Sequence, residues 1–125
     1  FNADHEETNP ESKELLISKL SCSLIEKEEL LTIVNKDSIL FDIVRKENLL
    51  GKYFCSYGVN EKYISILKDN GLKLTAISED GQVRAFEIED HPFFLGTLFQ
   101  PALTSTNNHP NPLIVEFVRR SIARK

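Results

Sequence analysis

The sequence predicts an α/β fold in which a β-sheet is covered by helices on both faces, so that the domain has three layers. Three observations lead to this prediction. Short apolar segments rich in Ile and Val occupy residues 15–54, an Asp80-Gly81 pair separates two segments of strand character, and residues 93–99 are apolar almost throughout. A run of that last kind is typical of a strand buried on both faces of its sheet. The length of 125 residues suits one compact domain or a large piece of one.

The N-terminal segment is predicted to be a loop, because residues 1–12 are acidic and polar and include Pro10. His5, Glu6 and Glu7 lie in this loop, and together they could suggest a metal site. No further ligands stand at a spacing that metal sites use, so a solvated acidic loop is the preferred interpretation. We therefore expect no metal.

Four short apolar segments follow, and each is predicted to be a short strand because Ile and Val favour extended backbone. The segments are ELLISKLSCSLI, ELLTIV, SILFDIV and LLGKYF, at residues 14–25, 29–34, 38–44 and 49–54. The ELLISKL part of the first segment is ambiguous between strand and helix, since its apolar spacing suits both.

A short amphipathic helix is predicted over residues 61–69, with Asn60 as its N-cap and Gly71 as its C-terminal stop. A strand over residues 72–78 follows. The Asp80-Gly81 pair can supply the positive φ values of a tight hairpin turn, so residues 82–88 are expected to return antiparallel to that strand.

The apolar run at residues 93–99 is expected to lie centrally in the sheet. Residues 101–112 have the composition of a loop, and Asn111-Pro112 is expected to cap and start a final helix. Five residues would form the apolar stripe of that helix: Leu113, Ile114, Phe117, Val118 and Ile122. The late Arg and Lys residues would complement the negative end of the helix dipole.

Composition excludes several classes of function. The net charge is −4, and basic residues cluster only at the extreme C-terminus, which argues against a nucleic-acid partner. No apolar run approaches the roughly 20 residues of a membrane span and no secretory leader opens the chain, so we expect no membrane partner and a cytoplasmic location. The sequence lacks phosphate-binding glycine loops and zinc motifs, so no cofactor is expected. Cys22 and Cys55 are interpreted as small buried hydrophobes.

The order of motifs resembles that of a known family. Residues 71–105, which read GLKLTAISEDGQVRAFEIEDHPFFLGTLFQPALTS, and residues 109–121, which read HPNPLIVEFVRRS, are similar to the end of the glutaminase domain of CTP synthase. That domain is a class I glutamine amidotransferase. Residues 49–67 resemble its glutamine-binding segment, and residues 1–10 resemble the loop that follows its nucleophile helix.

The resemblance implies a three-layer, flavodoxin-like amidotransferase fold. Residues 1–125 would form the C-terminal half of one such domain and supply its later strands, an antiparallel hairpin and the terminal helix. The N-terminal half, with the nucleophilic Cys on its sharp strand-to-helix turn, would lie upstream. Without it, one face of residues 93–99 would stay uncovered.

The family's catalytic His and Glu come from a His-Pro-Glu run, whose counterpart here is Gln100-Pro101-Ala102. The chemistry needs a Cys nucleophile, a His that carries protons and a Glu that fixes the tautomer of the His. A Gln amide does not titrate, and Ala has no polar side chain. The resemblance therefore implies that no catalytic residue is intact in this chain.

The glutamine-binding segment departs from the family in a similar way. When Tyr57, Val59 and Asn60 are aligned with the family's Tyr, Val and Asn, Ser56 stands in place of an Arg and Gly58 in place of a Glu. An Arg that could clamp a carboxylate is thus replaced by a short hydroxyl. Ser56, Tyr57 and Gly58 are the candidate substrate-binding residues.

Three functional hypotheses remain open. The preferred one is a pseudoenzyme that acts as a binding or regulatory module, with glutamine or a related small molecule as ligand. The alternative is an active amidotransferase that supplies ammonia to a nucleotide synthetase domain or subunit, using a displaced base such as His91 or His109. Cys55 as a relocated nucleophile is the weakest variant of this alternative. A structural role as an oligomer subunit is the third hypothesis, because the sequence leaves the oligomeric state open.

Overall fold

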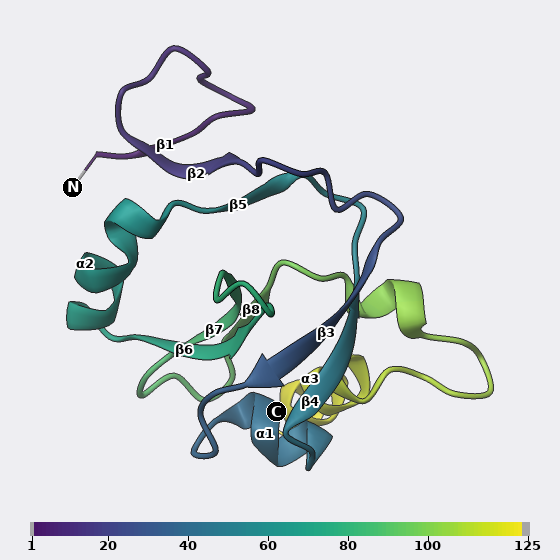
Figure 1. Cartoon of the computed structure of the whole chain (residues 1–125). Coiled ribbons are helices and arrows are strands. Elements are labelled where there is room, and N and C mark those ends of the chain that lie inside the picture. The colour runs from purple at the N-terminus through teal and green to yellow at the C-terminus, as the bar shows by residue number, and fades with distance from the viewer. Residues whose placement is uncertain (1, 124–125) are drawn as a thin grey trace.

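Eight strands form two sheets in the computed structural model, which describes residues 2–123 (Figure 1). The larger sheet has the strand order β4-β3-β6-β7-β8 and the smaller one β1-β2-β5. The strands are β1 (Asp4–His5), β2 (Leu15–Lys19), β3 (Glu28–Ile33), β4 (Asn48–Lys52), β5 (Tyr57–Val59), β6 (Leu72–Ile77), β7 (Val83–Ile88) and β8 (Leu95–Thr97). The helices are α1 (Ile39–Val44), α2 (Ile64–Asp69) and α3 (Pro112–Ala123), with short 3-10 turns η1 (Glu61–Tyr63) and η2 (Pro101–Thr104).

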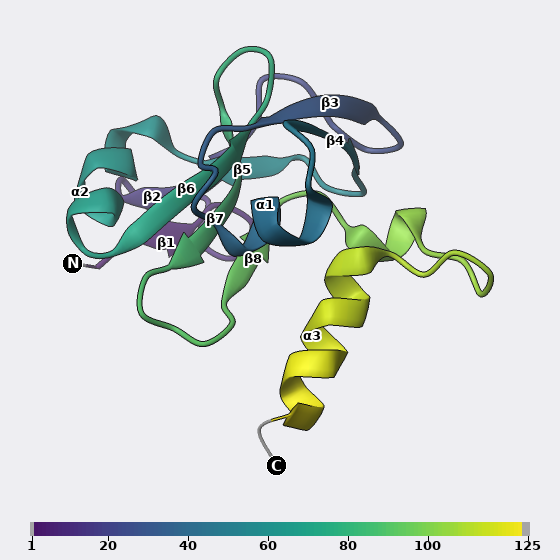
Figure 2. The ribbon, with the colours of Figure 1, turned by 90° about the horizontal axis from the view of Figure 1, so that it is seen from below.

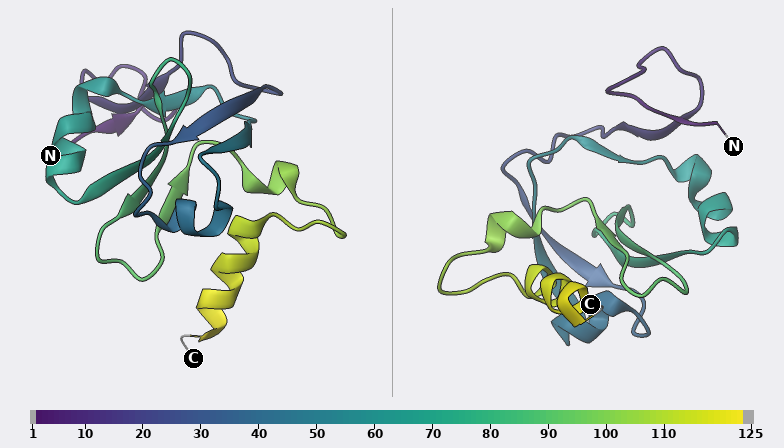
Figure 3. Two further views of the ribbon diagram at one scale, coloured as in Figure 1. Left: turned by 60° about the horizontal axis from the view of Figure 1, so that its bottom comes forward. Right: turned by 180° about the vertical axis from the view of Figure 1, so that it is seen from behind.

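All neighbouring strands of the larger sheet run antiparallel, whereas β1 and β2 of the smaller sheet are parallel. Seen from behind, the two sheets face each other across the molecule and α2 connects them on one side (Figure 3). Helices α1 and α3 pack against each other beside the larger sheet. Figure 2 shows that α3 then extends away from both sheets toward the C-terminus.

The predicted helix at residues 61–69 is confirmed as η1 followed by α2. The Asn60 side chain accepts a hydrogen bond from the Lys62 N–H at 3.1 Å, as an N-cap does. Gly71 ends the segment with a φ of 89°, a value that residues with a Cβ rarely adopt. The predicted cap and stop residues therefore both act as expected.

The predicted hairpin is confirmed, because β6 and β7 pair antiparallel around the Asp80-Gly81 turn. Only Gly81 of this pair has a positive φ, at 83°. The turn is closed by Ser78, whose N–H donates to the Gln82 carbonyl and whose hydroxyl accepts from the Gln82 N–H. The expectation of positive φ at both turn residues was thus wrong for Asp80.

The strand predicted at residues 38–44 is wrong, because Ile39–Val44 form helix α1. The Ser38 hydroxyl caps this helix by accepting from the Phe41 N–H at 3.0 Å. The buried carboxylate of Glu87 accepts from the Ile39 and Leu40 N–H groups at 3.0 and 2.9 Å. A negative charge at the positive end of a helix stabilises the first turn, and here it comes from β7, far away in sequence.

Two further expectations need correction. The apolar run at residues 93–99 contains only a three-residue strand, β8, and β8 lies at an edge of the sheet rather than in its centre. The N-terminal loop contains β1, which pairs with β2 through Asp4 and His5. The other strands predicted before residue 55 are present as β2, β3 and β4, although β2 ends at Lys19.

The hydrophobic core lies between the larger sheet, α1 and the start of α3. Its buried members are Leu24, Leu31, Ile33, Leu40, Tyr53, Ala76, Ala85, Phe99 and Leu113. The final helix begins at Pro112 as predicted, and the Asn111 side chain accepts from the Leu113 N–H at 2.9 Å. Of the five residues in the predicted apolar stripe, however, only Leu113 is buried.

Candidate functional site

Gln100 lies between β8 and η2, where the family resemblance would place a catalytic His. Its backbone N–H donates to the Lys52 carbonyl at 2.9 Å. Its side-chain oxygen accepts a hydrogen bond from the Phe54 N–H at 2.5 Å. Both contacts attach Gln100 to the segment at and just after the end of β4. The side-chain amide of Gln100 therefore holds the backbone of that segment in place.

Ala102 lies on η2, which starts at Pro101, a residue whose fixed φ suits the first turn of a helix. The side chain of Ala102 is exposed and offers no hydrogen-bonding group. The Thr104 hydroxyl donates to the Pro101 carbonyl and accepts from the Asn111 amide, which ties η2 to the start of α3. These hydrogen bonds hold the turn in place. Position 102 itself lacks a carboxylate.

The Ser56 side chain contacts a residue from another loop. Its hydroxyl lies 2.8 Å from the hydroxyl of Ser23, and its carbonyl accepts from the Leu20 N–H at 2.8 Å. The small side chains allow this close approach between the loop after β2 and the loop before β5. Ser56 thus joins two loops, and its hydroxyl already has a hydrogen-bond partner.

Gly58 is buried in β5, and the space beside it is filled. A Cβ added at this position would lie 2.6 Å from Leu20 Cδ2, closer than van der Waals contact allows. A Glu cannot stand at this position unless Leu20 moves. Packing around Gly58 therefore opposes the Glu that the resemblance would place at this position.

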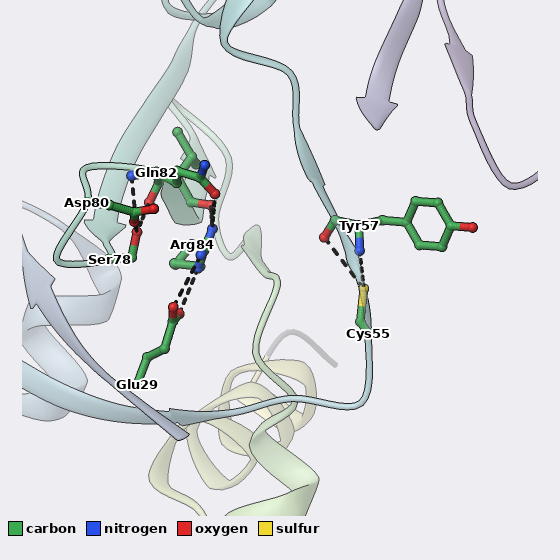
Figure 4. A network of polar contacts seen from close by, with 8 residues as sticks. Glu29, Cys55, Tyr57, Ser78, Asp80, Gln82 and Arg84 are labelled. Atoms are coloured by element: carbon green, nitrogen blue, oxygen red, sulfur yellow. Dashed lines mark hydrogen bonds and ion pairs between the residues drawn. The ribbon is translucent and has the colours of Figure 1, made fainter. Parts of the chain in front are cut away.

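Tyr57 and Cys55 lie close together on the same short segment, and the Tyr57 ring points away from the Cys55 thiol (Figure 4). The Tyr57 ring packs against the His5 ring, with 5.1 Å between centroids. Cys55 Sγ accepts from the Tyr57 N–H at 3.3 Å and donates to the Tyr57 carbonyl at 3.5 Å. The thiol is therefore engaged with backbone rather than with a base.

The two histidines proposed as displaced bases lie in other turns. His91 Nδ1 accepts from the Phe93 N–H at 3.2 Å, and its ring meets the edge of Phe94. His109 is exposed in the loop before α3, where its backbone bonds to Thr106. None of their hydrogen bonds or ring contacts in residues 2–123 involves Cys55 or Gln100. The structure does not bring the candidate base and nucleophile together.

Sequence reasoning missed a buried ion pair between Arg84 and Glu29 (Figure 4). Arg84 Nε lies 2.9 Å from Glu29 Oε2, and the Arg84 side chain is 3% exposed. Burial raises the pKa of the Glu29 carboxyl, but the hydrogen bonds and charge of Arg84 outweigh burial and hold that pKa below its usual range. Arg84 also lies 5.9 Å from the Tyr53 ring centroid. A basic residue within an otherwise ordinary strand pattern was the only sequence signal for this pair.

The Arg84 network is a structural feature of the hairpin. Arg84 also bonds the Gln82 side chain at 3.3 Å, and the Ser78 hydroxyl donates to the Asp80 carboxylate. That hydrogen bond lowers the pKa of Asp80. The network connects β3 to the β6–β7 turn and, as Figure 4 shows, lies apart from Cys55 and Tyr57. It joins two parts of the sheet and does not extend into the candidate site.

Residues able to hold a metal are not clustered in the described part of the chain. No group of three His, Cys, Asp or Glu side chains in residues 2–123 could hold a metal ion. In the same residues, no helix combines the length and the apolar character that crossing a bilayer requires.

The chain is similar in sequence to CTP synthases. It is 32% identical to the CTP synthase of Helicobacter pylori over 88 residues, which cover 70% of this chain and 16% of that protein. It is 36% identical to the CTP synthase of Methanopyrus kandleri over 74 residues, which cover 59% of this chain and 14% of that protein. The similarity thus spans a small part of each of these relatives. No protein-family model matches the chain.

The structure is similar to the glutaminase domain of Trypanosoma brucei CTPS, which was solved with bound acivicin. The TM-score is 0.84 at 26% identity, and the match covers 97% of this chain and 51% of the solved one. The chain is therefore homologous to the CTP synthase glutaminase domain, and the predicted class I glutamine amidotransferase fold is confirmed. It spans about half the length of that solved domain.

Proposed function

We propose, on the basis of this homology, that the chain is the C-terminal half of an amidotransferase domain that has lost glutamine hydrolysis and acts as a binding or regulatory module. One observation carries the proposal. Gln100 stands where the resemblance places the catalytic His, and its side-chain oxygen is bonded to the Phe54 N–H. A neutral amide in that position cannot accept and return a proton at neutral pH.

The absence of a catalytic base and of its carboxylate partner accounts for the proposed loss of glutamine hydrolysis. Hydrolysis through a thiolate requires a base that moves protons and a carboxylate that orients this base. Position 102 carries a methyl group, and the thiol of Cys55 bonds only to the Tyr57 backbone among the described residues. Removal of triad members reduces turnover by about 10⁴- to 10⁶-fold in well-studied hydrolases. The His5 ring lies beside Tyr57, but its Nδ1 accepts a hydrogen bond from the Glu7 N–H, and no imidazole among residues 2–123 bonds to Gln100 or Cys55.

The ligand proposed for the module is glutamine or a related small molecule. Ser56 and Gly58 replace the groups with which the family would bind substrate, so recognition through an Arg–carboxylate pair is absent from this segment. Tyr57 and the Ser23–Ser56 hydroxyl pair remain as polar groups at the same place. A synthetase domain or subunit is the proposed macromolecular partner, no cofactor or metal is involved, and the proposed location is cytoplasmic.

The overall homology favours a second candidate, an active glutaminase that feeds ammonia to a nucleotide synthetase. This function needs a base other than Gln100. His91 or His109 would have to move from the turns in which they now bond to Phe93 and Thr106. The bonds of these turns therefore argue against the second candidate.

Ligand-induced stabilisation tests the binding role, because a ligand that prefers the folded state must raise its stability. The intact polypeptide that carries these residues is heated with glutamine, glutamate or nucleotides. We expect an amino-acid ligand to raise the melting temperature, and Ser56→Ala to reduce that rise. Ser121→Ala is the matched control, since Ser121 lies on α3 and its hydroxyl donates to the Phe117 carbonyl of the same helix. Equal melting temperatures with and without every ligand would contradict the binding role.

A further inference from the structure

We propose that the groove between α1 and α3 binds a small molecule that carries a phosphate group. This α1–α3 groove has a volume of about 580 Å³, and its walls include Asp42, Arg45, Val115, Glu116 and Arg119. Pockets that hold small molecules typically have volumes of about 300–1,000 Å³. None of the candidate substrate-binding residues lines the groove, so the inference goes beyond the glutamine-binding role proposed above.

The concentration of arginines is the first observation. Residues 2–123 contain four arginines, and three of them line this groove, namely Arg45, Arg119 and Arg120. The fourth, Arg84, is buried elsewhere. The groove also has two carboxylates, so it keeps one positive charge in excess. In a chain whose net charge is −4, such a place attracts anions.

The arginines reach the groove from two different helices. Helices α1 and α3 pack against each other, and Figure 2 shows α1 beside the start of α3. Arg45 follows the last residue of α1 as its C-cap. Val115, Glu116 and Arg119 are spaced three or four residues apart and therefore share one side of α3. A ligand in the groove would thus meet a guanidinium group on each wall.

The Arg119 guanidinium is held in a fixed orientation. Its Nε donates to Glu116 Oε2 at 2.7 Å and its Nη2 donates to Glu116 Oε1 at 2.6 Å. These hydrogen bonds, together with that of Arg120, lower the pKa of Glu116 to about 2, so the pair persists at neutral pH. Among the described residues, Arg119 Nη1 has no hydrogen-bond partner, and the side chain is 64% exposed. One edge of an oriented guanidinium is therefore available to a ligand.

Arg45 stands at a position that usually favours a different residue type. Its φ is 55°, and its N–H donates to the Phe41 carbonyl at 2.8 Å to end α1. A helix end of this kind is most often a Gly or an Asn. The Arg45 side chain is 72% exposed and lies 3.5 Å from Asp42, which is longer than a charge-assisted hydrogen bond. Less common backbone geometry of this sort is often found where a side chain has a function.

Phosphate is the anion that suits this arrangement. A phosphate monoester has three terminal oxygens and about 1.5 to 2 negative charges at neutral pH. Guanidinium groups on two walls can each bond different oxygens of one phosphate, whereas a carboxylate has two oxygens and is satisfied by one Arg. Pro110, Pro112 and Val115 supply apolar wall for the rest of the ligand. We therefore infer a phosphate ester of a small organic molecule, such as a sugar phosphate.

Isothermal titration calorimetry of the intact natural polypeptide tests the proposal, with ribose 5-phosphate as the probe. Ribose and succinate are the reference compounds, because ribose lacks the phosphate and succinate offers only carboxylates. We expect ribose 5-phosphate to bind about 10-fold more tightly than either compound, or better. No binding of ribose 5-phosphate at about 10 mM would contradict the proposal. Equal affinity for succinate would contradict phosphate as the ligand group.

Three variants locate the binding site. Arg45→Asn removes one guanidinium but keeps a residue that tolerates a positive φ, and Arg119→Gln removes the other. Each should weaken the binding of ribose 5-phosphate about 10-fold or more, because a charge-assisted hydrogen bond is lost. Lys68→Asn is the control, since it removes the same charge from an exposed position on α2. It should change the affinity by about 2-fold or less.

Equal weakening by all three variants would show attraction by overall charge and would contradict the groove as the binding site. Arg45→Asn alone decides if Arg119→Gln does not fold. Glutamine is titrated separately into the same preparation. Binding of ribose 5-phosphate without any response to glutamine would contradict only the proposed glutamine-binding role. A response to glutamine without binding of ribose 5-phosphate would contradict only the present inference.

Discussion

The side-chain oxygen of Gln100 accepts a hydrogen bond from the backbone N–H of Phe54, which lies 46 positions earlier in the chain. This bond joins the turn after β8 to the end of β4. The backbone N–H of Gln100 also donates a hydrogen bond to the Lys52 carbonyl, in the same segment of the chain. The residue that the resemblance places at a catalytic position thus holds two parts of the fold together.

Replacing Gln100 with Leu should lower the free energy of unfolding by about 1 kcal/mol, because the acceptor for the Phe54 N–H is lost. Gln100→Glu is the matched control, since a carboxylate of similar length can accept the same bond. Urea unfolding of the two variants measures the difference. If Leu and Glu at this position gave equal stability, the bond would have no structural role.

Replacing Gly58 with Ala should destabilise the fold by about 1–3 kcal/mol, because the added methyl group overlaps Leu20. The overlap follows from the 2.6 Å separation of the new Cβ and Leu20 Cδ2. A double-mutant cycle with Leu20→Ala checks the cause. The double variant should lose less stability than the sum of the single variants. Strict additivity would show that another contact makes Gly58 necessary.

Replacing Glu87 with Ala should cost about 2–4 kcal/mol, because the Ile39 and Leu40 N–H groups would lose a charged partner at the start of α1. Glu89→Ala removes the same group from an exposed neighbouring position and serves as the control. Thermal unfolding at neutral pH measures both. A loss no larger for Glu87→Ala than for Glu89→Ala would contradict the capping role.

The Glu29–Arg84 pair should make stability depend on acid pH. The folded-state pKa of Glu29 lies below its unfolded value of about 4.3, so the stabilisation is complete above that value. It is lost as the pH falls through the lower, folded-state pKa. The melting temperature of Glu29→Gln should therefore lie below that of the wild type at pH 7, and should approach it as the pH falls through the folded-state pKa of Glu29. Glu79→Gln, at an exposed turn position, should show a difference that is small at both pH values.

Local signals in the sequence predicted the hairpin, the α2 segment and α3 correctly. Asn60, Gly81 and Asn111 each act through bonds or backbone angles within a few residues. Helix α1 was missed because the Glu87 carboxylate that supports its first turn comes from β7. Local propensity cannot register such a partner.

The position of β8 and the contacts of the site could not be predicted for a related reason. An apolar run indicates that a strand is to be covered, but it does not identify the segment that covers it. The resemblance identified Gln100, Ser56 and Gly58 from their positions in the motifs. Their partners Phe54, Ser23 and Leu20 lie on separate loops, and only the folded chain brings them together.

Release of ammonia from glutamine by the intact polypeptide is the measurement that tests the proposed loss of hydrolysis most directly. An active CTP synthase assayed under the same conditions provides the reference rate. We predict no release above the uncatalysed background, and no change when Gln100 is replaced by Ala. Turnover at ordinary enzyme rates, about 1 s⁻¹ or faster, would show that another base has taken over and would contradict the proposal.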